Sequence, residues 1–136
     1  MTSYVLLLIM EYLFVLQEIL INIAKTFRTD MLAEELYDYT RSAWRVNDKI
    51  VKSDCGPEYA FAVYQSIIRE VYKIAGWLAG GSTMRVAGRL SMIESNRMEF
   101  VGRIADGAIR KKYVGKSVDK YVKKGSQNPI RYVHCE

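Results

Sequence analysis

The chain of 136 residues has few of the side chains that cross-link a fold or bind metals: two cysteines and one histidine. Two isolated thiols, Cys55 and Cys135, supply neither a disulfide framework nor the ligands of a zinc site. We therefore expect no metal and no cofactor, and reduced thiols favour a cytoplasmic location. His134 precedes Cys135, but adjacent residues of a strand point to opposite faces, which disfavours a Cys–His nucleophile pair.

Proline is also scarce, with two residues, and the chain has no low-complexity run and no internal repeat. Half of the residues are apolar. A chain of this length buries a substantial core without metals or disulfides. These features predict one α+β domain over residues 17–136, preceded over residues 1–16 by an apolar extension or helix.

No basic residue occurs before Lys25, so the apolar run from Tyr4 to Ile23 lacks the positively charged start of a signal peptide. Glu11 and Glu18 interrupt the run, and each carboxylate is costly in hydrocarbon. We therefore expect no membrane partner. The remaining interpretation is a buried element of the domain, with a core strand at Ile19–Ala24.

Hydrophobic periodicity predicts two main helices. The first would cover residues 31–46, with Asp30 as its N-cap and a polar loop at residues 47–57 after it. Its buried stripe would consist of Leu32, Leu36, Tyr39 and Ala43. The second would cover residues 108–124, with a kink at Gly115.

Residues 59–77 allow two interpretations. Tyr59–Tyr64 and Ile67–Trp77 fit a hairpin or one helix, and their β-branched and aromatic residues favour the hairpin. Further strands are expected at Arg97–Ile104 and Ile130–Val133. The order β-α-β-β-β-α-β predicts a mostly antiparallel sheet or a small barrel.

Positive charge is concentrated near the carboxyl end. Residues 101–136 hold nine of the 20 Lys and Arg residues but only three of the 15 acids. Five lysines recur at roughly helical spacing and would form one stripe on the second helix: Lys112, Lys116, Lys120, Lys123 and Lys124. Such a stripe attracts polyanions, and its alternative interpretation is a solubilising helix face.

Other candidate binding residues lie outside this stripe. Trp44 with Arg41 would line a base or nucleotide pocket at the end of the first helix, because every base offers a π-face. Core packing is the alternative for Trp44. Arg131 would contact phosphates, and Asn128 would read a base edge or fix the turn around it.

Two partial motifs point to enzymes without supporting them. Gly115-Lys116-Ser117 resembles the end of a Walker A loop, but Arg110 stands where that loop needs glycine. Tyr113–Ser117 looks like the second half of a GIY-YIG nuclease motif, and no first half lies at the required spacing. No catalytic residue follows, so we expect a binding protein, with an RNA-cleaving toxin or GIY-YIG-like nuclease as the alternative.

Three segments together resemble a set of small bacterial and mobile-element proteins: residues 35–44, residues 59–64 with 68–72, and residues 125–133. The resemblance covers roughly residues 19–135. This set of proteins is in turn similar to the PUA-like (ASCH/EVE-type) class. It implies a β-barrel that binds RNA or modified DNA bases in a pocket between the barrel and a helix. It also favours the hairpin at residues 59–77.

The sequence thus predicts a nucleic-acid-binding domain, for RNA or for modified or single-stranded DNA, that uses a basic C-terminal helix and an aromatic pocket. An alternative of another class is a protein-interaction module, such as a dimeric defence or counter-defence component. Its homodimer would form through the apolar N-terminus.

Overall fold

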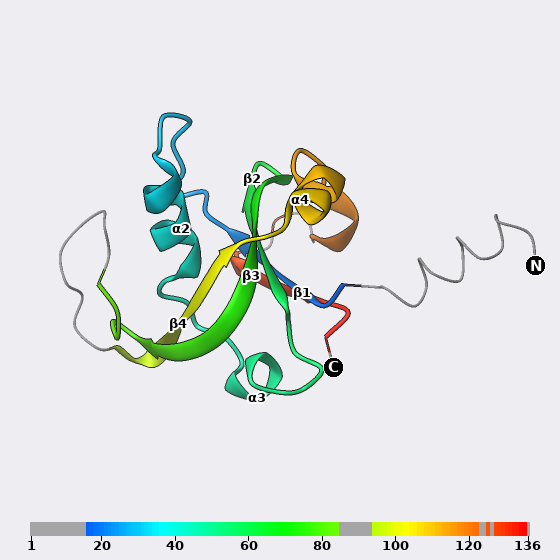
Figure 1. Ribbon diagram of the computed structural model, residues 1–136. Coiled ribbons are helices and arrows are strands. Elements are labelled where there is room, and N and C mark those ends of the chain that lie inside the picture. The colour runs from blue at the N-terminus through cyan, green and yellow to red at the C-terminus, as the bar shows by residue number, and fades with distance from the viewer. Residues whose placement is uncertain (1–15, 85–93, 123–124, 126, 136) are drawn as a thin grey trace, which may run out of the picture.

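A sheet of five strands in the order β4-β3-β2-β1-β5 forms the centre of the protein (Figure 1). The computed structural model describes residues 16–84, 94–122, 125 and 127–135. The strands are β1 (Glu18–Asn22), β2 (Tyr59–Tyr64), β3 (Ile67–Gly80), β4 (Glu94–Ile104) and β5 (Ile130–Val133). Only the β1–β2 pair is parallel, which confirms an α+β fold with a mostly antiparallel sheet. The sheet is open, with β4 and β5 at its edges, and the closed barrel is not observed.

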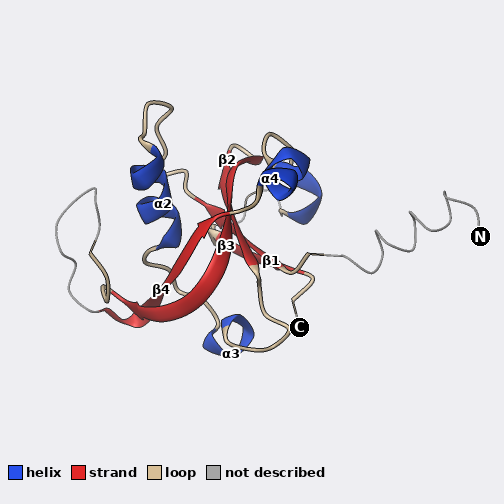
Figure 2. Cartoon of the chain, in the orientation of Figure 1, coloured by secondary structure: helices blue, strands red, loops and turns tan. Residues whose placement is uncertain are grey.

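Among the described residues, three helices accompany the sheet: α2 (Ala33–Arg41), α3 (Asp48–Val51) and α4 (Gly107–Tyr113). A single 3₁₀ turn, η1, follows at Asp119–Tyr121. α2 and α4 lie on opposite faces of the sheet (Figure 2). Leu20 points to the cluster under α4, while Ile19 and Ile21 point to the cluster beneath α2. This alternation along β1 gives the protein two separate cores.

The hairpin between β2 and β3 confirms the strand interpretation of residues 59–77, and the single-helix alternative is wrong. Its turn residues, Gln65 and Ser66, have φ angles of 52° and 62°. Two positive φ angles match the right-handed twist of the flanking strands even though no glycine is present. The strands expected at residues 19–24, 97–104 and 130–133 are also confirmed, with bounds shifted by up to three residues.

The long strand β3 curves around α2, as Figure 1 shows. Register shifts between β3 and β4 accompany this curvature, one of them between Ile74 and Gly76. Gly102 on β4 lies so close to β3 that a Cβ atom there would be 2.1 Å from the Lys73 carbonyl oxygen. On the concave side, the Tyr37 hydroxyl of α2 accepts from the Gly102 amide at 2.9 Å and donates to its carbonyl at 3.1 Å.

The first helix is shorter than predicted. It begins at Ala33, so Leu32 and not Asp30 is its N-cap, and Leu32 is 62% exposed instead of buried. It ends at Arg41 because the next residues pair with the sheet: Trp44 and Met98 exchange two backbone hydrogen bonds of 2.9 Å. The polar loop predicted after it contains α3, which the Asn47 side chain caps.

The second predicted helix also stops early. α4 ends at Tyr113, and Gly115 then turns the chain with a φ of +88°. The backbone beyond it pairs with the start of β3, where the Ile68 amide donates to the Lys116 carbonyl at 2.9 Å. The lysines therefore do not form a stripe on one helix, and that prediction is wrong. Lys123 and Lys124 lie outside the described residues, as does almost all of the predicted N-terminal extension.

The segment after α2 spans the gap between the two edge strands. Trp44 pairs with Met98 of β4, and three residues later the Asn47 amide donates to the Tyr132 hydroxyl of β5 at 2.7 Å. No helix in the described part of the chain has the length and apolar character that crossing a membrane requires.

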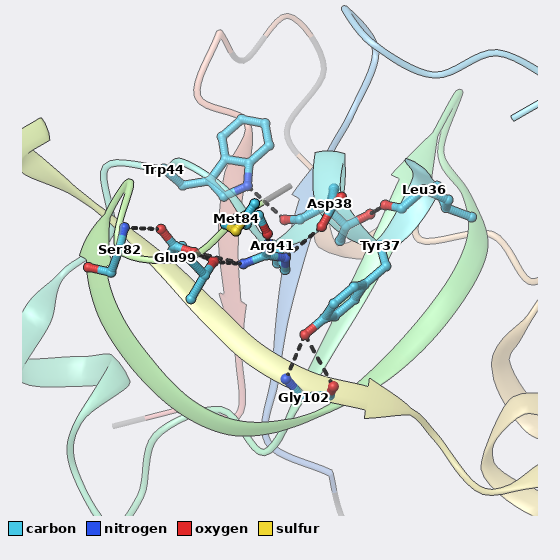
Figure 3. Close-up of polar contacts among 11 residues, drawn as sticks. Leu36, Tyr37, Asp38, Arg41, Trp44, Ser82, Met84, Glu99 and Gly102 are labelled. Carbon is cyan, nitrogen blue, oxygen red and sulfur yellow. Dashed lines mark hydrogen bonds and ion pairs between the residues drawn. The ribbon is translucent and has the colours of Figure 1, made fainter. Parts of the chain in front are cut away.

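A buried ionic network holds α2 in the curve of the sheet (Figure 3). Arg41 is 3% exposed and bonds Glu99 of β4 at 2.7 Å and Asp38 of α2 at 2.9 Å. Glu99 is fully buried and also accepts from the Ser82 amide at 2.8 Å and from the Thr83 hydroxyl. Burial acts to raise the pKa of Glu99, but these hydrogen bonds outweigh it and lower the pKa.

Replacing Arg41 should destabilise the whole domain. Arg41→Met would remove the guanidinium that bonds the buried carboxylate of Glu99, at a cost of about 3–5 kcal/mol in the free energy of unfolding. Urea unfolding followed by circular dichroism measures this cost. As the control, Arg103→Met removes an exposed pair with Asp106 and should cost at most about 1 kcal/mol. Equal losses in the two variants would contradict the role of the network.

Candidate binding site

A cleft of about 580 Å³ opens beside the end of α2, at the carboxyl end of β1. We call it the tryptophan cleft. Its walls come from the segment after β1, the residues after α2, one residue of β4 and the segment that leads into β5. The lining residues are Asn22, Ile23, Ala24, Lys25, Thr26, Trp44, Arg45, Arg97, Gln127, Asn128, Pro129 and Ile130.

Two asparagines fix the backbone of the cleft. The Asn22 side-chain oxygen accepts from the Ala24 amide at 3.0 Å, and the Asn128 oxygen accepts from the Ile130 amide at 3.0 Å. The Asn22 amide donates to the Pro129 carbonyl at 2.8 Å, which joins the two segments. Because each oxygen is engaged, the Nδ2 donors of both side chains are the groups left to meet a ligand.

Trp44 is held at two points. Its Nε1 donates to the Thr40 carbonyl at 2.7 Å, as Figure 3 shows, and its backbone is paired with Met98. The ring packs against the core on the α2 face while still lining the cleft. Both uses expected for Trp44, core packing and a cleft wall, are therefore present in one side chain.

The charged residues of the cleft are all basic. Lys25 and Arg45 are exposed, and Arg97 is half-buried, with Nη1 donating to the Ala43 carbonyl at 3.0 Å. No acid is present among the described residues that line the cleft. Lys25, Arg97 and Asn22 were missed from the sequence, because only the fold brings them beside Trp44.

The other predicted binding residues are distributed differently. Arg41 does not line the cleft, because its guanidinium is buried in the network with Glu99. Asn128 lies in the cleft, where it fixes the turn. Arg131 is exposed on β5 opposite Leu20, so its side chain lies on the α4 face.

Three of the lysines gather around a second cleft of about 330 Å³ on the α4 face, which we call the lysine cleft. Its lining residues are Leu16, Glu18, Phe61, Ile68, Lys112, Tyr113, Lys116, Ser117, Val118, Lys120, Tyr121 and His134. Glu18, the first residue of β1, is 6% exposed, and burial raises its pKa to about 7 while Lys120 and Lys112 oppose the shift. Positive side chains therefore occur on both faces of the sheet.

No family model, curated protein or solved structure was found that matches this chain. Within residues 16–84 and 94–135, apart from the few positions not described, no three His, Cys, Asp or Glu side chains are placed to hold a metal ion together. What the tryptophan cleft offers is an aromatic ring, amide donors and positive charge.

The buried Glu18 should make stability depend on pH. Its pKa is higher in the folded state than the ordinary 4.5, so the unfolded chain holds fewer protons between pH 4.5 and 7. Stability is therefore lost as the pH rises through this window. Glu18→Gln should remove that loss and be roughly 1–3 kcal/mol more stable than the native protein at pH 8. Urea unfolding at pH 5 and pH 8 measures the difference; an unchanged pH dependence in the variant would refute it.

Proposed function

We propose that this protein binds single-stranded nucleic acid, RNA or DNA, in the tryptophan cleft. The observation that carries the proposal is the lining of that cleft: a fixed indole, two asparagine amide donors and three basic side chains, without an acid among the described lining residues. Stacking on a rigid aromatic ring combined with a positively charged groove is the usual way in which proteins hold unpaired bases.

Each group has a distinct role in the proposal. A base stacks on Trp44, and the Nδ2 donors of Asn22 and Asn128 bond to acceptors on its edge. Lys25 and Arg45, which are exposed, contact the flanking phosphates and position the strand without reading its sequence. The volume of about 580 Å³ lies within the range typical of small-ligand pockets, so it accommodates a nucleotide.

We also propose the PUA-like class as the family. Support comes from the curved five-stranded sheet, the helix in its concavity and the cleft between the end of that helix and the sheet. Family and cleft together favour an unpaired or modified base as the bound group. Such a ligand and the free thiols of Cys55 and Cys135 fit a cytoplasmic setting.

Removing the indole should weaken binding to a fluorescein-labelled single-stranded oligonucleotide such as U8 or dT8. Trp44→Ala should raise the Kd by about 5–150-fold, because stacking of one base contributes about 1–3 kcal/mol. Fluorescence anisotropy at several salt concentrations measures the Kd. Arg45→Gln and Lys25→Gln should each lower the salt slope by roughly one.

A single-tryptophan variant supplies both the control and a direct readout. Trp77 of β3 packs against Phe100 of β4 and does not line the cleft, so Trp77→Phe should bind as the native protein does. Trp44 is then the only tryptophan, and its fluorescence should be quenched by the bound base. Absence of quenching at saturating oligonucleotide, or equal Kd values for Trp44→Ala and Trp77→Phe, would refute the proposal.

A further inference from the structure

The three lysines of the lysine cleft come from three separate elements. Lys112 comes from the last turn of α4, Lys116 from the loop that follows, and Lys120 from η1. Hydrophobic residues from β2, β3 and the η1 region form part of its lining, including Phe61, Ile68 and Val118. Lysines from three elements therefore line one hollow, which a single solubilising helix face does not provide.

The backbone that carries these lysines is fixed to the sheet. The Gly115 amide donates to the Ile68 carbonyl at 2.8 Å, and the Ile68 amide donates to the Lys116 carbonyl at 2.9 Å. Two residues further on, the Val118 amide donates to the Ser66 carbonyl at 2.8 Å. Because this loop pairs with the start of β3, the lysines extend from a preorganised backbone.

The basic groups of the cleft are interleaved with aromatic rings. The Lys112 ammonium lies 5.3 Å from the centre of the Tyr113 ring, and the Lys120 ammonium lies 4.8 Å from that of Tyr121. His134 meets the Tyr121 ring edge-on. No ion pair engages any of the three lysines within the described part of the chain. Ammonium groups beside these partly buried tyrosine rings suit the closely spaced phosphates of a nucleic acid strand, which can be held without contact to a base.

We propose that the lysine cleft is a second binding site, for the phosphodiester backbone of nucleic acid, on the opposite face of the sheet from the tryptophan cleft. Lys112, Lys116 and Lys120 contact the phosphates, and Arg131 lies on the same face. The inference does not depend on the tryptophan cleft, because phosphate contacts require no base.

Glu18 makes this site sensitive to pH. The charges of Lys120 and Lys112 act on its carboxyl, and Lys116, His134, Tyr113 and Tyr121 line the same cleft. Tyr59 lies opposite Glu18 on β2, with the Lys73 ammonium over its ring, and the Cys135 Sγ donates to the Glu18 backbone carbonyl at 3.6 Å. Burial raises the Glu18 pKa to about 7, so this carboxyl changes its charge near neutral pH. A bound phosphate repels the carboxylate, so binding favours the protonated form and weakens as the pH rises.

The test uses the full chain and a probe without bases, a tetramer of abasic deoxyribose phosphodiesters. A ¹H–¹⁵N NMR titration at low salt should shift the amides of Ile68, Lys116 and Val118. The triple variant Lys112→Ala, Lys116→Ala, Lys120→Ala should bind at least about tenfold more weakly. A matched variant, Lys49→Ala, Lys52→Ala, Lys111→Ala, removes the same charge from residues that do not line the cleft and should bind within about twofold of the native protein.

The same titration separates this inference from the proposed function. Trp44→Ala should leave abasic binding unchanged, whereas it weakens binding of a base-containing oligonucleotide. Equal losses in the two triple variants, whose folding the same spectra report, would overturn the second site. So would displacement of the probe by an oligoglutamate peptide of equal charge, which would instead indicate a site for acidic protein segments.

The role of Glu18 has its own readout. Affinity for the abasic probe should fall by up to about tenfold from pH 6 to pH 8, and the Glu18→Gln variant should lose this dependence. His134 lines the same cleft, so His134→Asn serves as the matched control. An unaltered pH profile in Glu18→Gln, or its loss in His134→Asn alone, would overturn the role of Glu18.

Discussion

The ion pair between Arg41 and Glu99 joins α2 to β4, and the tryptophan cleft takes Trp44 from the end of the first and Arg97 from the second. It ties the last turn of α2 to the middle of β4, in a place where neither charge reaches water. Such a pair is weak evidence for stability, but losing one partner is costly, so it fixes one position of the helix against the sheet. Trp44 follows three residues later, and its orientation depends on where the helix ends.

The sheet separates two surfaces that share a sign of charge but differ in construction. On the α2 face, the tryptophan cleft combines an indole held by hydrogen bonds with asparagines whose oxygens already fix the backbone. On the α4 face, three lysines and a buried carboxyl line one cleft. The first arrangement suits recognition of a base and the second suits attraction of phosphates.

Local patterns predicted the strands and failed at the helix ends. The hairpin at residues 59–80 follows from continuous β-branched and aromatic residues, and the turn at Gln65-Ser66 needed only a two-residue break. Helix bounds were wrong because long-range pairing overrides propensity: Trp44 with Met98, and Lys116 with Ile68, take backbone groups that a longer helix would use. Arg41 was predicted to line a pocket because it is close to Trp44 in the sequence. Its partner Glu99 is 58 residues away along the chain, and no local pattern connects the two.

The segment from Trp44 to Asn47 also affects how this sheet avoids pairing with the strands of other molecules. An open sheet presents unpaired amides and carbonyls along both outer strands, and these are templates for adding a strand from a second molecule. Here one short segment pairs with the outer backbone of β4 at Met98 and then bonds the Tyr132 side chain of β5. Chains that lost the pairing at Met98 would leave more of the β4 edge open, and strand addition from a second molecule would compete with folding there.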